Sequence, residues 1–136
     1  MSELSGIETE RQEAGSIVQQ FICRAPKKNH QALVQLAKEF TDMFRNQGGI
    51  RTEYFQLSNT DDMSDFINMA KTVTSSKSAE EEEIWNEQIF FVDSKQKDEH
   101  MVKCMSDQNV DRLYKQFISL ITLGSAIMGE FNRIIV

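Results

Sequence analysis

Apolar positions along the chain follow two different spacings, and these spacings predict strands and helices in a definite order. The segment 17–24 (IVQQFICR) carries apolar side chains at odd and even positions, which predicts a strand covered on both faces. Pro26 stands where a helix can begin, because the N–H that it lacks would have no partner there. Gly48 and Gly49 are suited to ending that helix. A helix over 27–46 is predicted from one apolar stripe, at Leu33, Leu36, Ala37, Phe40, Met43 and Phe44.

The second half of the chain repeats the alternation of strand and helix. A helix at 95–105 is expected to point Met101, Cys104 and Met105 inward, and another helix begins near Val110 and stops at Gly124. The three further strands are predicted at 50–57 (IRTEYFQL), 84–93 (IWNEQIFFVD) and 126–136 (AIMGEFNRIIV).

Residues 58–83 are the least regular part of the chain. A turn is predicted near residues 59–62, followed by one short amphipathic helix with Met63, Phe66, Ile67 and Ala70 on its apolar side. The run SSKSAEEEE is interpreted as a solvated loop, because the four glutamates at 80–83 repel one another. A metal site made by these carboxylates is the less favoured interpretation.

This order of elements predicts an α+β fold. Right-handed crossovers place the helices of both β–helix–β units on one face of the sheet, which gives a ferredoxin-like βαββαβ arrangement with a four-stranded antiparallel sheet. We expect one domain over residues 15–136, preceded by a flexible acidic arm at 1–14. Because the strands are apolar on both faces, the uncovered sheet face is expected to pack against a second copy in a two-fold dimer. A charge at Phe21 or Phe90 is therefore expected to split the dimer or unfold the chain.

Three stretches within residues 16–136 show a family resemblance: the first strand and helix with the strand that follows (VQQFICRAPKKNHQALVQLAKEFTDMFRNQGGIRTEYFQL), the run IFFVDSKQKDEHMVKCMSDQNV and the closing AIMGEFNRIIV. These stretches resemble the YbaA-like family of uncharacterised bacterial proteins. The resemblance implies a dimeric α/β-barrel, a superfamily that includes small cofactor-free monooxygenases and haem-degrading enzymes. It carries over no catalytic residue. The acidic arm and the SSKSAEEEE run depart from the expected family pattern.

Charge and composition narrow the range of partners and compartments. The net charge is -6, which argues against a nucleic-acid binder and against docking on an anionic membrane, since both need clustered Lys and Arg. The polar N-terminus has no apolar signal segment, and the apolar stretch 117–123 is too short to span a bilayer. We expect a cytoplasmic protein with no membrane and no nucleic-acid partner.

Four side chains are candidates for lining a pocket between the sheet and the helices. Tyr54 and Trp85 are aromatic side chains with polar groups that need partners when buried. His30, near the N-terminus of the first helix, is a possible general base if it faces a pocket, although a surface position is favoured. His100 is placed four residues before Cys104, and a buried Cys104 with a partly exposed His100 is preferred to a metal pair.

The candidate side chains do not identify a chemical reaction. A thiolate pair of Cys23 with His30 or His100 is less favoured than a Cys23 buried in the core. The chain has no CxxC, no HExxH and no glycine-rich phosphate loop, so no metal and no cofactor are predicted, and the catalytic residues are unknown.

Three functions are compatible with the sequence. The first is a dimeric protein that binds a small molecule, which the apolar sheet favours. The second is an enzyme resembling a cofactor-free monooxygenase that acts on a small organic substrate, which rests on fold analogy alone. The third is a regulatory or stress-associated dimer that works through protein contacts, with the acidic arm as its contact segment.

Overall fold

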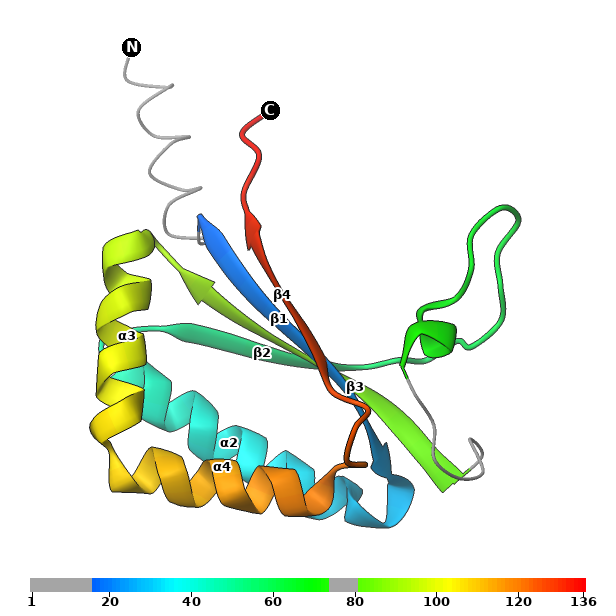
Figure 1. Ribbon diagram of the computed structural model, residues 1–136, viewed down its shortest axis with the longest axis horizontal. Helices are drawn as coiled ribbons and strands as arrows, with labels where there is room; N and C mark the ends of the chain where they lie inside the picture. The colour runs from blue at the N-terminus through cyan, green and yellow to red at the C-terminus, as the bar shows by residue number, and fades with distance from the viewer. Residues whose placement is uncertain (1–15, 74–80) are drawn as a thin grey trace.

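The computed structural model describes residues 16–73 and 81–136, which form a four-stranded sheet with three α-helices on one face (Figure 1). All strand pairs are antiparallel, and the strand order is β2-β3-β1-β4. This confirms the predicted α+β fold with its ferredoxin-like strand order. The elements are β1 (Ile17–Pro26), the 3-10 turn η1 (Lys27–Asn29), α2 (His30–Asn46), β2 (Arg51–Gln56), the 3-10 turn η2 (Met69–Thr72), β3 (Glu82–Phe91), α3 (Ser94–Ser106), α4 (Gln108–Leu120) and β4 (Ile127–Asn132).

The register of the two central strands decides which side chains face the helices. Cys23 of β1 lies opposite Trp85 of β3, and Tyr54 of β2 lies opposite Glu87 of β3. Directly opposed residues share a face of the sheet, and each strand alternates between faces. The odd-numbered positions of β1 and β3 and the even-numbered positions of β2 therefore point toward the helix layer.

The helix layer covers this face through two neighbouring clusters. Phe44 of α2 packs near Phe91 at one end of the sheet, where Phe91 is fully buried. Leu33 of α2 packs near Trp85 at the other end. The buried members are Ile17, Phe44, Ile50, Ile89 and Phe91 in the first cluster, and Cys23, Ala25, Leu33, Trp85 and Ile121 in the second.

The opposite face of the sheet is covered only in part, and by the chain itself. Val73 packs on Ile22 and Ile84 next to η2. The buried guanidinium of Arg24 anchors this segment, because its Nε donates to the carbonyl of Val73 at 2.8 Å and its Nη2 to that of Ala70 at 2.6 Å. Pairing with two carbonyls satisfies the buried charge and ties residues 70–73 to the sheet.

The remainder of this surface we call the open face. Its apolar members include Phe55, Ile127 and Phe131, whose exposed fractions are 49%, 43% and 55%. Arg51 lies over the ring of Phe90, 4.2 Å from the ring centroid. The open face consists of Val18, Gln20, Arg51, Glu53, Phe55, Asn86, Gln88, Phe90, Ile127 and Phe131, as the strand register places them.

Residues 58–68 correct the predicted short helix. The chain there forms a projecting arm with a single bridge between Met63 and Phe66 (Figure 1). Asn68 holds the arm together, because its side-chain Nδ2 donates hydrogen bonds to the backbone carbonyls of Asn59 and Asp61. Side-chain bonds of this kind offer the backbone an alternative to helical hydrogen bonds. The apolar side chains of Met63, Phe66 and Ile67 are left more than two-thirds exposed, at 67%, 75% and 73%.

Two strand boundaries also differ from the prediction. β3 begins at Glu82, so the interpretation of the glutamate run as wholly solvated is wrong for Glu82 and Glu83, which are both buried. β4 ends at Asn132, which lies opposite Ile17, the first residue of β1. The arm predicted at 1–14 and the stretch 74–80 lie outside the described residues.

Candidate functional site

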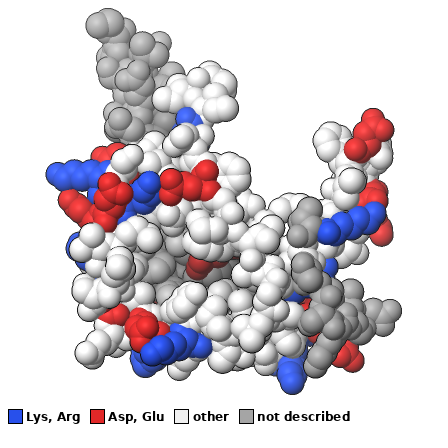
Figure 2. Space-filling view, in the orientation of Figure 1, with Lys and Arg blue, Asp and Glu red and all other residues white. Residues whose placement is uncertain are grey.

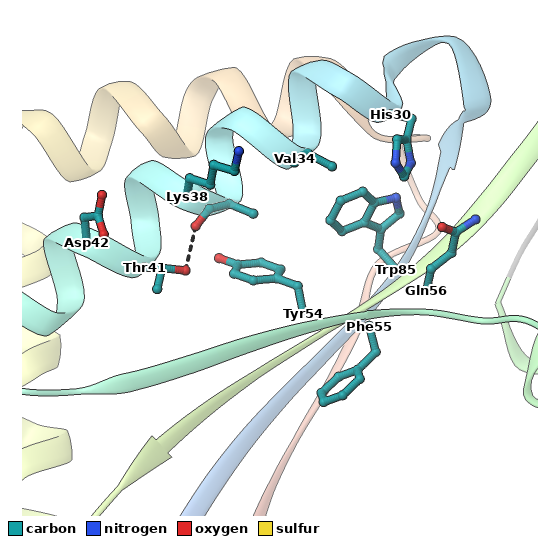
Figure 3. Close-up of a pocket in the computed structure, with 10 residues that line it drawn as sticks. His30, Val34, Lys38, Thr41, Asp42, Tyr54, Phe55, Gln56 and Trp85 are labelled. Carbon is teal, nitrogen blue, oxygen red and sulfur yellow. Dashed lines mark hydrogen bonds between the residues drawn. The ribbon is translucent and has the colours of Figure 1, made fainter.

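A groove of about 530 Å³ lies between α2 and the edge strand β2, with Trp85 of β3 at one end (Figure 3). Pockets that hold small organic molecules have volumes in this range, of roughly 300–1,000 Å³. The lining residues are His30, Val34, Ala37, Lys38, Thr41, Asp42, Tyr54, Phe55, Gln56 and Trp85. Three of the four predicted pocket residues, Tyr54, Trp85 and His30, are therefore brought together here.

Helical spacing explains why α2 presents these side chains. His30, Val34 and Thr41 follow one another at intervals of a turn or two, which places them on one side of the helix. The adjacent stripe with Leu33, Leu36 and Phe44 is buried. The groove thus uses the border of the apolar stripe, where half-buried side chains meet the exposed Lys38 and Asp42.

Strand β2 supplies the opposite wall. Tyr54 points toward α2, whereas Phe55 points to the other side of the strand and contributes only at the edge (Figure 3). The rings of Tyr54 and Trp85 meet edge to face, with their centroids 6.3 Å apart. These two rings give the groove an aromatic floor.

Glu83 organises the polar end of the groove. Its Oε1 accepts a hydrogen bond from Trp85 Nε1 at 2.6 Å and lies 2.8 Å from His30 Nδ1, with which it also forms a hydrogen bond. Its Oε2 accepts one from Gln56 Nε2 at 3.1 Å. Three elements, β2, β3 and the start of α2, are therefore joined through one buried carboxyl group. Sequence reasoning missed Glu83, although strand alternation puts it on the same face as Trp85.

A second carboxyl group lies next to the phenol of Tyr54. The Tyr54 hydroxyl is buried and makes no hydrogen bond of ordinary geometry, and Glu87 is its cross-strand neighbour. Burial raises the pKa of the Glu87 carboxyl, and the Tyr54 hydroxyl opposes that shift only in part. Burial and the nearby Glu87 likewise raise the pKa of the Tyr54 phenol. Both shifts favour the neutral forms under the aromatic floor.

His100, the fourth predicted pocket residue, does not line the groove. It is buried in α3, with its ring centroid 4.7 Å from that of Phe44 and 5.3 Å from that of Phe91. Its Nε2 lies 3.3 Å from the Sγ of Cys104. Burial, with a smaller contribution from Lys103, lowers the pKa of His100. His100 is thus a buried residue that packs against Phe44 and Phe91 of the first cluster.

The orientation of α3 reverses part of the prediction. Met101 and Met105, expected to point inward, are exposed at 46% and 87%. His100, expected to be partly exposed, is buried, and Cys104 is half-buried. The aromatic rings of Phe44 and Phe91 accept an imidazole between them, so the helix turns its histidine rather than its methionines toward the sheet.

The raised pKa values of both cysteine thiols argue against nucleophilic roles, although His100 lies next to Cys104. Cys23 is buried, and burial with the nearby Glu87 raises the pKa of its thiol to about 12. Burial, followed by Asp107, raises the pKa of Cys104 as well. Since thiolates are the reactive form, both residues behave as small apolar side chains. Across residues 16–73 and 81–136, His, Cys, Asp and Glu form no group of three or more that is arranged to hold a metal ion.

Charges of both signs are mixed on the surface. Figure 2 shows acidic and basic side chains side by side near the start of α3 and on the projecting arm, with largely uncharged surface between them. Phosphate backbones are bound by continuous basic surfaces, and this view shows none. Within the described part of the chain, no helix combines the length and apolar composition that a bilayer crossing requires.

A comparison with models of known protein families assigns this chain to a family. The model of a family described as "Protein of unknown function (DUF1428)" matches residues 16–118. This chain belongs to the DUF1428 family. The match contains every groove residue of the DUF1428 protein and ends within α4, before β4.

Comparisons of the DUF1428 protein with solved structures and with curated proteins do not identify its function. One solved structure that it resembles is a NIPSNAP family protein from Agrobacterium tumefaciens, with 17% sequence identity and a TM-score of 0.49. The likeness covers 87% of this chain and 85% of that one. No curated protein matches the chain.

Proposed function

We propose that the DUF1428 protein binds a small organic molecule in the groove between α2 and β2. The observation that carries this proposal is the open groove itself, with an aromatic floor and a cluster of hydrogen-bonded polar groups at one end. Binding sites for small molecules combine an apolar lining with a few placed polar groups. The floor of Tyr54 and Trp85 fits a flat, apolar ligand body.

Trp85 is the only tryptophan of the chain, so its fluorescence reports on this groove alone. Native mass spectrometry of freshly purified protein comes first, because extra mass identifies a ligand carried through purification. The protein is then titrated with a set of small aromatic compounds while the fluorescence emission of Trp85 is followed. We expect saturable changes with some members of the set.

A pair of lysine substitutions on α2 separates groove binding from other effects. Val34→Lys places a charge in the groove, whereas Gln31→Lys places the same charge on the exposed side of the helix. We expect Val34→Lys to weaken binding at least tenfold and Gln31→Lys to leave it unchanged. Equal affinities for both variants would exclude the groove as the site.

We further infer that two copies associate through the open face. Phe55, Phe90 and Phe131 are apolar side chains of this face, and its one pair of charges, Arg51 and Glu53, is compensated at 3.7 Å. A chain with a net charge of -6 repels its own copies, so a neutral surface is where they approach at lowest cost. We also retain three expectations from the sequence as proposals: membership of the YbaA-like family, assembly as a dimeric α/β-barrel and a cytoplasmic location.

Sedimentation velocity on the full chain tests this association. Phe90→Asp introduces a charge on the open face, and Tyr114→Asp introduces one at an exposed aromatic residue of α4. We expect the parent and Tyr114→Asp to sediment as dimers and Phe90→Asp as a monomer. Phe21, the other residue considered for this test, faces the helix layer, so a charge there tests folding instead.

One observation favours an enzyme as the second candidate function. The groove brings a histidine, His30, and Trp85 to one place, with ring centroids 5.8 Å apart. A cofactor-free oxygenase would need such side chains next to its substrate. Consumption of oxygen with a bound aromatic compound, lost in His30→Gln, would support this second candidate over simple binding.

A further inference from the structure

The imidazole of His30 is held in one orientation by a buried carboxyl group. The side chain of Glu83 is 6% exposed, and its Oε1 lies 2.8 Å from His30 Nδ1. The indole of Trp85 can only donate, and it donates to the same Oε1, while Gln56 donates to Oε2. An ionised carboxylate has no proton to donate and only accepts, so with Glu83 in that form His30 Nδ1 is the donor of the third hydrogen bond.

This arrangement leaves the second ring nitrogen of His30 as an acceptor. In a neutral imidazole, a proton on Nδ1 leaves a lone pair on Nε2. Among the described residues, no group hydrogen-bonds to His30 Nε2, and the side chain is 37% exposed where it lines the groove. The ring also lies beside Trp85, tilted by 52°. A lone pair with a fixed direction is thus available next to an aromatic surface.

We propose that His30 accepts the proton of an acidic hydroxyl group, of the phenol or enol class, on a ligand whose flat body lies along Trp85 and Tyr54. The ligand O–H bond breaks, an Nε2–H bond forms, and the electron pair stays on the ligand oxygen. The imidazolium charge is stabilised by the carboxylate of Glu83, which acts as a positioning residue. This inference rests on the proposed function of the groove and names its ligand class.

The same geometry predicts a preference within that class. A ligand with the same body and no acidic proton gains nothing from Nε2, so methylation of the hydroxyl should weaken binding. Hydrogen bonds to a charged group contribute about 1.5–3 kcal/mol, which corresponds to roughly tenfold or more in affinity. The probes 4-nitrophenol and 4-nitroanisole form such a pair, because they differ only by the methyl group on the oxygen.

The first experiment titrates the full chain with both probes while Trp85 emission and the visible spectrum are recorded. Near neutral pH, where free 4-nitrophenol is partly protonated and a neutral imidazole can accept a proton, we expect the bound probe to show a stronger phenolate absorption band than the free probe and to bind about tenfold more tightly than 4-nitroanisole. His30→Gln should abolish this increase in the band and remove the difference between the probes. Equal affinities and no increase in the phenolate band with the parent protein would overturn the inference, while binding of 4-nitroanisole would still uphold the groove as a ligand site.

The second experiment needs no ligand. The chain has two histidines, His30 and His100, so nitrogen-15 NMR of the imidazoles gives two sets of signals, which His30→Gln assigns. At alkaline pH we expect His30 to carry its proton on Nδ1, the tautomer that is less common in free imidazoles. A proton on Nε2 would contradict the inference whatever the probes do. If neither probe binds, the inference also fails, and the screen with Trp85 emission decides separately on the proposed function.

Discussion

Replacing Glu83 by Gln tests whether one carboxyl group joins the strands and the helix at the end of the groove. In the parent protein its two oxygens accept hydrogen bonds from Trp85, His30 and Gln56. A glutamine at position 83 keeps the shape of the side chain and one acceptor oxygen. Its amide nitrogen would meet the nitrogen of Gln56, whose side chain can turn over and present its own oxygen.

The expected loss follows from the kind of bond that is changed. A hydrogen bond to a charged group contributes about 1.5–3 kcal/mol and a neutral one about 0.5–1.5 kcal/mol, so each bond retained by Glu83→Gln weakens by about 1 kcal/mol. The bonds from Trp85 and His30 are retained in neutral form, and the bond from the exposed Gln56 contributes little because water can replace it, so the free energy of unfolding should fall by about 2 kcal/mol. For a chain of this length, 1 kcal/mol shifts Tm by about 4 °C, so Tm should fall by about 8 °C.

The neighbouring glutamates provide a matched control. Glu81 belongs to the same run but is exposed, so Glu81→Gln removes the same charge without removing the buried hydrogen bonds. Exposed substitutions of this kind usually change stability by less than about 0.5 kcal/mol. Thermal unfolding followed by circular dichroism, with urea unfolding as a check, compares the two variants. Equal unfolding midpoints for Glu81→Gln and Glu83→Gln would refute the role assigned to Glu83.

Three further outcomes are expected. In the folded protein, Ellman's reagent should modify Cys104 well before Cys23, whose thiol has a pKa of about 12, and equal rates of absorbance increase for both thiols would contradict this. Because the pKa of Glu87 is raised in the folded state, the folded protein binds its proton more tightly, and stability should fall as pH rises from the ordinary value of 4.5 through the raised pKa. Glu87→Gln should lack this decline in urea unfolding between pH 4 and pH 8, and parallel curves for parent and variant would disprove it. Arg24→Gln should release residues 70–73 from the sheet and make the arm more sensitive to limited proteolysis, whereas an unchanged cleavage pattern would show that Arg24 does not anchor it.

The groove residues that the sequence predicts are those that a local sequence pattern identifies. Tyr54 and Trp85 were found because aromatic side chains with polar groups stand out on strands, and the fold brings both to one groove. His30 was found as a histidine at the start of a helix. Glu83 was missed because a run of four glutamates reads locally as a solvated segment, and only the pairing of β3 with β1 carries Glu83 into the sheet.

The sequence by itself determined the type and order of the four strands and the three α-helices, because apolar spacing depends only on which residues must be covered. It also determined that both faces of the sheet carry apolar side chains. The tertiary structure decided which side chains meet across elements: it turned His100 rather than Met101 toward Phe44, and laid Val73 over part of the face that the pattern left bare. It joined Glu83 to His30, 53 positions apart in the chain, by a bond that no local pattern encodes. Such contacts depend on register and packing, which arise only when distant segments are assembled.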